Sequence, residues 1–375
     1  METNFPTNAS YSKETAKRLS VERSYLYQPS GEWTYSHHPH ITQFNDRFYA
    51  IWSNGHVNED DVGQRVLISS STDFITWSDP IPLLDSQPGK HNEVVLTAAG
   101  FHKYEDFMVA YIGQYEYEPE CVKNGARLPD DSDHMDTLLR ALVTLDGITW
   151  QGPISMRIPI VPNHGPQPTS SGRLIISGNI SFPYTDDPTG LSGWKMTGIY
   201  PAEMASGIVD DSESFHLVQE EAEWPVGLCE GSFFQTDDQV LHMMLRSNVD
   251  KLWITESADD GTTWSEPLET DFTDNATKFH LGRLPDGRFY YVGCPDPTPR
   301  YQRSPLVLSL SKDGISFDQH YILADQSYKQ LSQGLYKGGE YGYPHTLLHD
   351  NALHIIISRQ KEGVEVLRVQ LSELQ

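Results

Sequence analysis

The sequence predicts an all-β chain folded as a single β-propeller of four-stranded blades, and three observations predict it. The chain has 24 prolines and 28 glycines in 375 residues, and such frequent turn residues favour short strands over long helices. A hairpin pattern recurs six times, each copy with a polar start, a short strand, a turn and an apolar strand. A second turn pattern follows each of the first five copies. The resulting period, roughly fifty to seventy-five residues, is that of four-stranded propeller blades.

Six β-hairpins are predicted along the chain. YSHHPHITQFNDRFYAIWSNG (35–55) has a polar tight turn between two runs of alternating aromatic and aliphatic residues, which is typical of a β-hairpin. The other five copies occupy residues 91–113, 163–179, 229–248, 279–293 and 343–360. An early strand, SYLY at 24–27, is expected to complete the last blade. We therefore expect one domain over 1–375 with an N-terminal extension at 1–20. The pattern predicts six blades, and a seventh blade remains an alternative if the first 35 residues contribute more than one strand.

The second turn pattern places an aspartate four residues before a Trp or Phe. Its copies occupy residues 71–80, 144–153, 209–218, 257–267 and 311–320, and SADDGTTW fits the S-x-D-x-G-x-x-W form of the Asp-box. The aspartate is expected to accept backbone amides across a tight turn, and the aromatic ring to fill the space between neighbouring sheets. We assign these aspartates a structural role.

Charge and composition limit the partners. A formal net charge of -25 disfavours nucleic acid and anionic membranes as partners and leaves small ligands open, because a local cationic pocket can coexist with an acidic surface. No apolar stretch is long enough to span a bilayer, and the first residues lack the apolar core of a signal peptide. We expect a cytoplasmic protein, or a secreted one whose signal has been removed. Three scattered cysteines predict neither a disulfide framework nor a zinc motif.

The candidate site follows from propeller topology, which places the start of each innermost strand and the exit of the second strand on one face. The starts carry His37, His38 and His40; His91; His164; Glu230; His280; and Tyr343 with His345. Long irregular loops follow the second strands, and such loops are usually functional. A lone histidine at a strand start is typically structural, whereas convergence favours a site role for His38, His91 and His164. Proline within His-His-Pro-His and the lack of a carboxylate at fixed spacing disfavour zinc.

Three further segments carry a resemblance to a known family. LRSNVDKLWITESADDGTTWSEP (245–267), RSPLVLSLSKDGISF (303–317) and the closing segment that begins YPHTLLHDNALHIIISRQKEGVEVLR (343–368) resemble the sialidase-like propeller superfamily, across essentially the whole chain. True sialidases hold the substrate carboxylate with three arginines and use a tyrosine and a glutamate as nucleophile and base. The resemblance implies Arg246 and Arg303 as two of the arginines, Tyr343 as nucleophile and Glu230 as its partner. The first arginine normally lies in an Arg-Ile-Pro near the N-terminus, but here that string stands at 157–159.

The first blade, with SHHPH followed by SNG, ED and GQR (53–65), looks more like the superfamily branch of rhamnose-glucuronate cleaving enzymes and ulvan lyases. Resemblance to that branch implies that histidine, tyrosine and arginine side chains carry out the catalysis. β-Elimination beside a uronate needs a base for the C5 proton, an acid for the leaving oxygen and a cation for the carboxylate. We expect His38 or His91 as base, Tyr111 as acid and Arg127 or Arg246 as clamp. His164 joins the expected catalytic set, and His40, His280, His345 and Arg303 the substrate-binding set.

The sequence therefore predicts an enzyme that cleaves a glycosidic bond in an acidic, uronate-containing glycan, with elimination favoured over hydrolysis. The first alternative is a glycoside hydrolase using Glu230 and Tyr343, and the second is a non-catalytic propeller that binds a glycan or protein. The acidic surface disfavours long polyanions and favours a short or terminal glycan. Neither a metal nor an organic cofactor is expected, and the sequence does not predict the oligomeric state.

Overall fold

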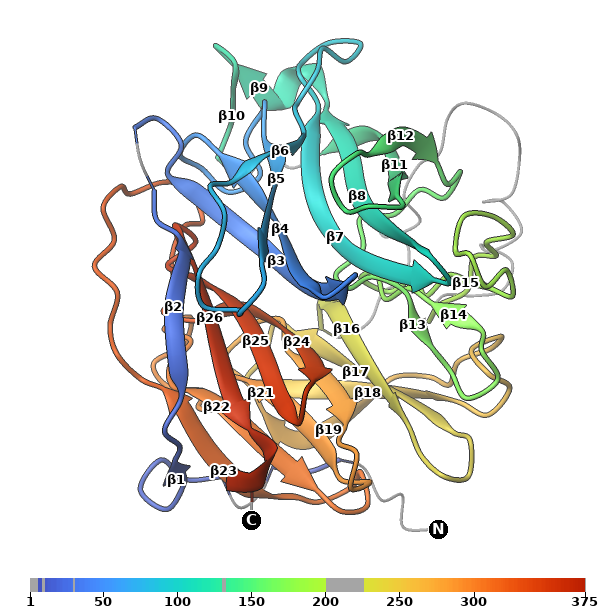
Figure 1. The fold of residues 1–375 in the computed structure, drawn as a ribbon, viewed down its shortest axis with the longest axis vertical. Helices are drawn as coiled ribbons and strands as arrows, with labels where there is room; N and C mark the ends of the chain where they lie inside the picture. Colours follow the sequence, from blue (N-terminus) through green and yellow to red (C-terminus); the bar gives the residue numbers. More distant parts are fainter. Residues whose placement is uncertain (1–5, 9–10, 30, 130–132, 200–225, 375) are drawn as a thin grey trace.

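Six β-sheets arranged as propeller blades make up the protein in its computed structural model (Figure 1). The structure describes residues 6–8, 11–29, 31–129, 133–199 and 226–374. Within these ranges the helical segments are two short 3-10 turns, Pro119–Cys121 and Leu371–Glu373, and no helix is long and apolar enough to cross a membrane. The predicted all-β propeller is confirmed.

Each predicted hairpin forms the two inner strands of one sheet. The strands of blades 1 to 3 are β3 (Tyr35–Phe44), β4 (Arg47–Gly55), β5 (Arg65–Ser71) and β6 (Ile81–Leu84); β7 (Val95–Tyr104), β8 (Phe107–Tyr117), β11 (His134–Thr144) and β12 (Gln151–Ser155); and β13 (Gln167–Pro168), β14 (Leu174–Ile175) and β15 (Tyr184–Thr185). A small ribbon, β9 (Val122–Lys123) with β10 (Ala126–Arg127), lies in the long loop after β8. Blade 3 has the shortest strands of the six blades in the described structure, because each of its three strands has two residues.

Blades 4 to 6 are more regular. Their strands are β16 (Leu228–Gln235), β17 (Leu241–Ser247), β18 (Lys251–Ser257) and β19 (Leu268–Thr273); β20 (His280–Arg283), β21 (Phe289–Gly293), β22 (Leu306–Ser311) and β23 (Phe317–Ala324); and β24 (Gly342–His349), β25 (Ala352–Arg359) and β26 (Gly363–Gln370). The N-terminal β2 (Glu22–Tyr27) pairs antiparallel with β26 and completes blade 6, as the SYLY segment predicted. β1 (Lys17–Arg18) adds a parallel strand to blade 5.

The aspartate turns have the predicted local structure. The Asp146 carboxylate accepts the amides of Ile148 at 2.8 Å and Thr149 at 2.7 Å, and Asp73 and Asp313 accept their own pairs of amides in the same way. The aromatic residue that ends each turn packs against a core between blades, as Trp264 does on Phe182 with ring centroids 4.9 Å apart. The copy predicted at 209–218 lies outside the described residues.

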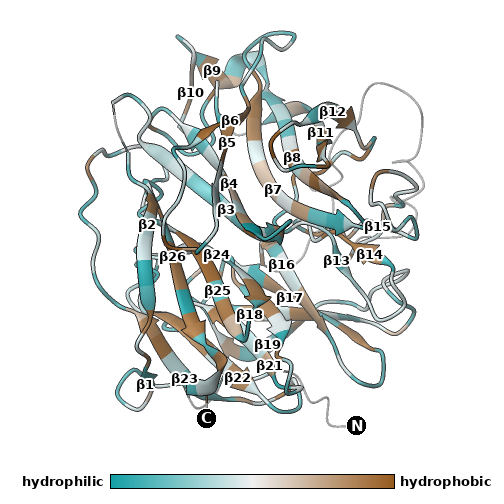
Figure 2. Cartoon of the chain, in the orientation of Figure 1, coloured by the Kyte–Doolittle hydropathy of each residue, from teal (hydrophilic) through white to brown (hydrophobic). Residues whose placement is uncertain are grey.

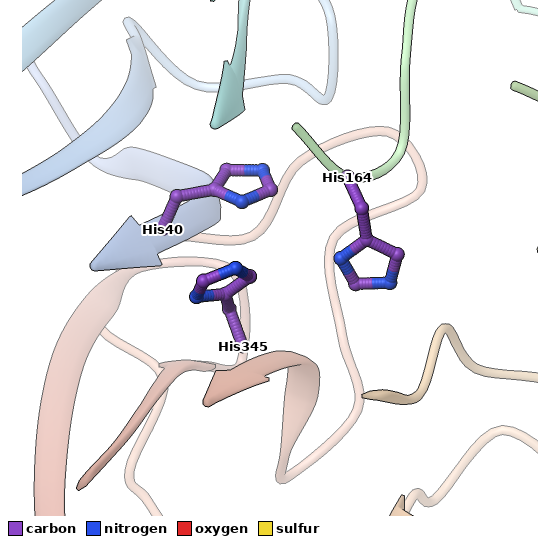
Figure 3. Close-up of side chains that lie close together, drawn as sticks. All are labelled: His40, His164 and His345. Atoms are coloured by element: carbon purple, nitrogen blue, oxygen red, sulfur yellow. The ribbon is translucent and has the colours of Figure 1, made fainter. Parts of the chain in front are cut away.

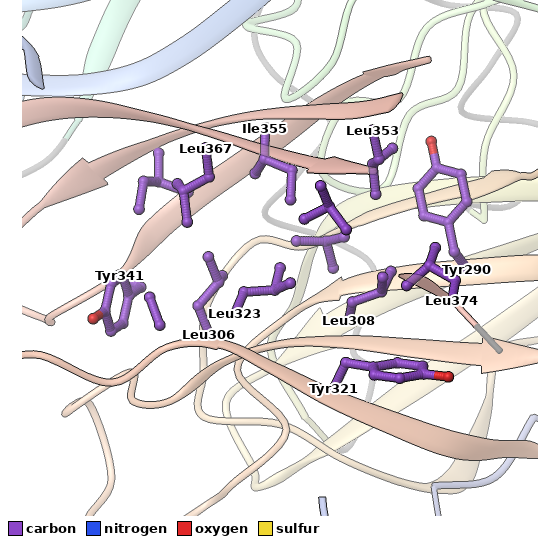
Figure 4. Close-up of a cluster of buried hydrophobic side chains, with 14 of the residues drawn as sticks. Tyr290, Leu306, Leu308, Tyr321, Leu323, Tyr341, Leu353, Ile355, Leu367 and Leu374 are labelled. Carbon is purple, nitrogen blue, oxygen red and sulfur yellow. The ribbon is translucent and has the colours of Figure 1, made fainter. Parts of the chain in front are cut away.

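The core consists of apolar layers between neighbouring blades, and many residues within the strands are hydrophobic (Figure 2). The largest layer joins blades 5 and 6, where Leu308 of β22 meets Leu353 and Ile355 of β25 (Figure 4). All three side chains are fully buried, and each such residue stabilises the fold by about 1.5–3 kcal/mol relative to exposure. This packing holds the loop-bearing face of the propeller in place.

Candidate functional site

One cavity opens on the face where the innermost strands begin. Its volume is about 490 Å³, within the size range of small-ligand pockets. The polar residues that line it are His38, Glu59, Asp60, Thr97, Tyr115, Tyr117, Arg127, His134, Asn163, Asn179, Ser181, Glu230, Tyr336 and Tyr343. They come from five of the six blades and their loops, which supports the prediction that this face carries the site.

Three of these side chains are positioned by the same local device. His38, Glu230 and Tyr343 lie in the innermost strands β3, β16 and β24, and all have a positive φ, between 52° and 53°. The strand register shifts at each of these positions. A bulge of this kind re-aims a side chain out of the regular alternation, so all three residues line the cavity.

A tyrosine–glutamate pair is part of the cavity lining. The Tyr343 hydroxyl donates to Glu230 Oε1, and Arg246 Nη1 donates to Glu230 Oε2 at 2.6 Å and to the Tyr343 hydroxyl at 3.4 Å. Burial alone would raise the pKa of Glu230, but the Arg246 charge and the two hydrogen bonds hold it below its usual value. Burial and the Glu230 charge raise the pKa of Tyr343. The pair is therefore a neutral phenol donating to an ionised carboxylate.

Positive charge around this pair exceeds the negative charge. The guanidinium carbon of Arg303 lies 5.8 Å, and Lys278 Nζ 5.3 Å, from the centre of the Tyr343 ring. Among the described residues, Nε and Nη1 of Arg303 and Nε of Arg246 are buried without a hydrogen-bond partner. Burial lowers the pKa of Lys278 to about 7. Buried N–H groups without partners are costly, and an anionic ligand would satisfy them.

The side of the cavity formed by blade 1 carries a histidine and two carboxyl groups. His38 bonds to Ser53 Oγ at 3.1 Å, and burial lowers its pKa to about 3, so the ring is neutral. Glu59 pairs with the buried ammonium of Lys361. Burial raises the pKa of Asp60, although the side-chain amide of Gln64 donates to it at 3.2 Å. A raised pKa favours the protonated form of a carboxyl group, which is the form that can donate a proton.

Arg127 lines the cavity next to the loop of blade 1. Its guanidinium carbon lies 5.3 Å from the ring of Tyr117 and 5.1 Å from the ring of Tyr336, and its Nη1 donates to the Glu59 carbonyl at 3.2 Å. The structure thus brings Arg127 to the cavity, as expected for a residue that contacts substrate.

Three expected catalytic residues, Tyr111, His91 and His164, do not line the cavity. Tyr111 is completely buried in the core beside blade 3, where its hydroxyl donates to the Gly190 carbonyl at 2.9 Å. His91 is exposed on a loop, because β7 begins only at Val95, four residues later. The expected arginine string also lies elsewhere, since Arg157 is exposed and does not line the cavity.

The other expected histidines form a separate group at the centre of the propeller. His40, His164, His280 and His345 contact one another, and none of them lines the cavity. Glu59 and Asp60 are among the cavity residues that sequence reasoning missed, although the long loop 54–64 was a signal for both. Lys278, which is buried beside Tyr343, was also missed and had no signal, because a lysine before a strand is ordinarily exposed.

Comparison with solved structures places the fold among sialidases. A protein of unknown function from Dyadobacter fermentans is 17% identical, with 94% of this chain and 99% of that chain covered and a TM-score of 0.64. A Trypanosoma rangeli sialidase is 12% identical, with 95% of this chain and 60% of that chain covered and a TM-score of 0.65. The NanB sialidase of Streptococcus pneumoniae is 12% identical, with 94% and 71% covered and a TM-score of 0.62.

At the level of sequence, no curated protein matches the chain significantly. The profile of the BNR repeat-like domain matches residues 38–355, which include hairpins two to five, most of the first and sixth hairpins, and four complete aspartate turns of the described structure. The chain belongs to the BNR repeat-like family and has the sialidase-like propeller fold.

Proposed function

We propose that this protein is a glycoside hydrolase that removes a terminal, carboxylate-bearing sugar from a glycan. The observation that carries the proposal is the Tyr343–Glu230 hydrogen bond beside two arginines whose buried N–H groups lack partners. A sugar carboxylate supplies the missing negative charge, and Arg246 and Arg303 would bind it through charge-assisted hydrogen bonds. The cavity volume suits one or two sugar rings better than a long chain.

The proposed mechanism passes through a covalent intermediate. The Tyr343 oxygen attacks the anomeric carbon while its proton passes to Glu230, which lies within hydrogen-bonding contact. Asp60, the cavity carboxyl whose pKa burial raises, donates its proton to the leaving oxygen. Water then attacks the same carbon, Asp60 takes the proton of that water, and Glu230 returns the first proton to Tyr343. Two displacements give net retention of configuration.

β-Elimination beside a uronate is the second candidate. The neutral His38 ring lies 5.2 Å from the Tyr343 ring, so His38 as base and Tyr343 as acid could act across one substrate. The lowered pKa of His38, about 3, makes it a weak proton acceptor and favours hydrolysis. In this scheme Tyr343 replaces Tyr111, and His38 remains as the base in place of His91.

One experiment separates the two reactions. We would follow ultraviolet absorbance and reducing-sugar release together on sialosides, rhamnose-capped glucuronate glycans and ulvan oligosaccharides. Hydrolysis predicts sugar release without absorbance, lost in Tyr343→Phe and retained in His91→Ala. Absorbance from an unsaturated uronate, lost in His38→Ala, would replace hydrolysis by elimination. Binding of a glycan without turnover of any substrate would contradict both reactions and would identify the protein as a non-catalytic, glycan-binding propeller.

A further inference from the structure

Three imidazoles from three different blades meet at the centre of the propeller. His40 comes from β3, His345 from β24, and His164 from the segment before β13 (Figure 3). His40 and His345 lie two positions beyond His38 and Tyr343 along the same strands, and they do not line the cavity. One nitrogen from each of the three rings lies within 4.8 Å of the other two. The three rings form a histidine triad distinct from the proposed catalytic site.

The hydrogen bonding of this triad is incomplete. His40 is completely buried, and neither of its ring nitrogens has a hydrogen-bond partner among the described residues. His164 is 1% exposed, and its Nδ1 likewise has none. Buried polar atoms without partners are rare, because each one loses its hydration without compensation. These nitrogens therefore point to a group that satisfies them.

The tautomer of His164 is set by its neighbour. Its Nε2 lies 3.0 Å from the Phe279 carbonyl, which can only accept, so Nε2 carries the proton and Nδ1 carries the free lone pair. A histidine that donates one nitrogen to a carbonyl and offers the other is the usual arrangement of a metal ligand. His280, in contrast, accepts the Thr346 amide at Nδ1 and contacts Gln167 through Nε2. Its hydrogen-bonding capacity is used, and it is not part of the triad.

We propose that His40, His164 and His345 bind one divalent transition-metal ion, and that zinc is the ion best matched to three neutral imidazoles. The three nitrogens lie within 4.8 Å of one another, so each lies at most about 2.8 Å from the centre of their triangle, against about 2.1 Å for a zinc–nitrogen bond. The rings would therefore move inward by at most about 0.7 Å each. His345 is the least restrained of the three, since it accepts only a long bond of 3.4 Å from the Ile41 amide.

The metal would link blade 3, which has the shortest strands, to blades 1 and 6, where the two ends of the propeller meet. His164 precedes blade 3, whose strands have two residues each, whereas His40 and His345 belong to blades 1 and 6. The buried Lys278 ammonium, bonded to the Asn163 carbonyl at 2.5 Å, opposes a second cation and would moderate the affinity. This role is structural and independent of the proposed hydrolase. It departs from the sequence expectation that no metal is present.

The test uses the full chain without a polyhistidine tag. After incubation with zinc and gel filtration, elemental analysis should find about one zinc per wild-type chain. His40→Gln and His164→Gln should retain at most about a tenth of that, and the control His91→Gln, on an exposed loop, should match wild type. A chelator should lower the Tm of wild type and of the control, and added zinc should restore it. Neither treatment should move the Tm of the two triad variants.

Two results would overturn the proposal. One is a wild-type chain that holds less than about a tenth of an equivalent of zinc; the other is retention of zinc by both triad variants. If the variants fail to fold, cobalt titration of the wild type decides the question. Visible absorption bands of low-coordinate cobalt that saturate at about one equivalent support the triad, and their absence contradicts it.

Discussion

His38, Glu230 and Tyr343 show how backbone strain places a side chain. Each holds a positive φ that a residue with a Cβ rarely adopts, at a cost on the order of 1–3 kcal/mol. Packing of the neighbouring strands must offset this cost, because the regular alternation of β3, β16 and β24 would turn these side chains away from the cavity. Strain of this kind at three cavity residues is what a site that positions reacting groups requires.

Replacing the nucleophile tests the proposed chemistry at this scale. Tyr343→Phe removes the attacking oxygen and should lower kcat by about 10³-fold or more while the glycan still binds. Tyr111→Phe is the matched control, because it removes a hydroxyl bonded to the Gly190 carbonyl in the core. It should lower the free energy of unfolding by about 1 kcal/mol and leave kcat unchanged. Steady-state kinetics and urea unfolding measure both, and equal losses of kcat would contradict the assignment.

A buried carboxyl group next to the two arginines makes stability depend on pH. Burial raises the pKa of Asp274 to about 7, so between about pH 4 and pH 7 the folded chain holds a proton that the unfolded chain has released. Its contribution to the free energy of unfolding therefore falls as the pH rises through this window, by about 1.4 kcal/mol per unit of pKa shift.

Asp274→Asn should remove that dependence. Relative to wild type, the variant should gain free energy of unfolding as the pH rises from about 4 to about 8. Urea unfolding at several pH values measures the gain. A constant difference between the two chains across this window would show that Asp274 ionises normally in the folded state.

At the scale of elements, the aspartate turns stabilise blades without touching the cavity. Asp313 accepts the amides of Ile315 at 2.8 Å and Ser316 at 2.9 Å. Partial burial acts to raise the pKa of Asp313, but these amides hold it below its usual value. A lowered carboxyl pKa means that the stabilisation is present at neutral pH and is lost as the pH falls through the folded-state pKa.

Asp313→Ala should therefore lower the Tm by a few degrees at neutral pH and by less in acid, with kcat/KM unchanged at a temperature where both chains are folded. Asp318→Ala, an exposed carboxylate of the same blade, is the control and should leave the Tm unchanged. Thermal unfolding followed by circular dichroism at two pH values gives the comparison. A loss of activity in the folded Asp313 variant would mean that this turn does more than stabilise blade 5.

At the scale of the whole molecule, the net charge opposes the local charge of the site. The chain carries a formal charge of -25, whereas Arg246, Arg303 and Lys278 surround Tyr343 with positive charge. An anionic glycan is repelled at long range and attracted at short range. Salt screens the long-range repulsion more than the buried contacts.

Raising the ionic strength from about 10 mM to about 150 mM should therefore increase kcat/KM for the acidic glycan. A neutral ester of the same glycan, which lacks the carboxylate charge, serves as the control and should show no such increase. Initial rates at low substrate concentration measure the effect. A fall in kcat/KM with salt for the acidic glycan would mean that attraction by the cavity dominates at long range.

The sequence by itself determined the propeller, because its signals are local. Turn residues, alternating apolar positions and the aspartate turns act within a few neighbouring residues, so six hairpins and the closing strand at 24–27 could be predicted. Resemblance to sialidases added Glu230 and Tyr343, and the structure brings these two side chains into contact.

Only the tertiary structure decided which side chains share the cavity. Tyr111 faces the core and His91 precedes its strand by several residues, while bulges turn His38 toward the cavity and leave His40 at the axis. Lys278 lies next to Tyr343 because the fold buries it. The physical reason is that bulges and contacts between blades bring together residues that are far apart in the chain. The sequence pattern of a single strand contains no information about these contacts.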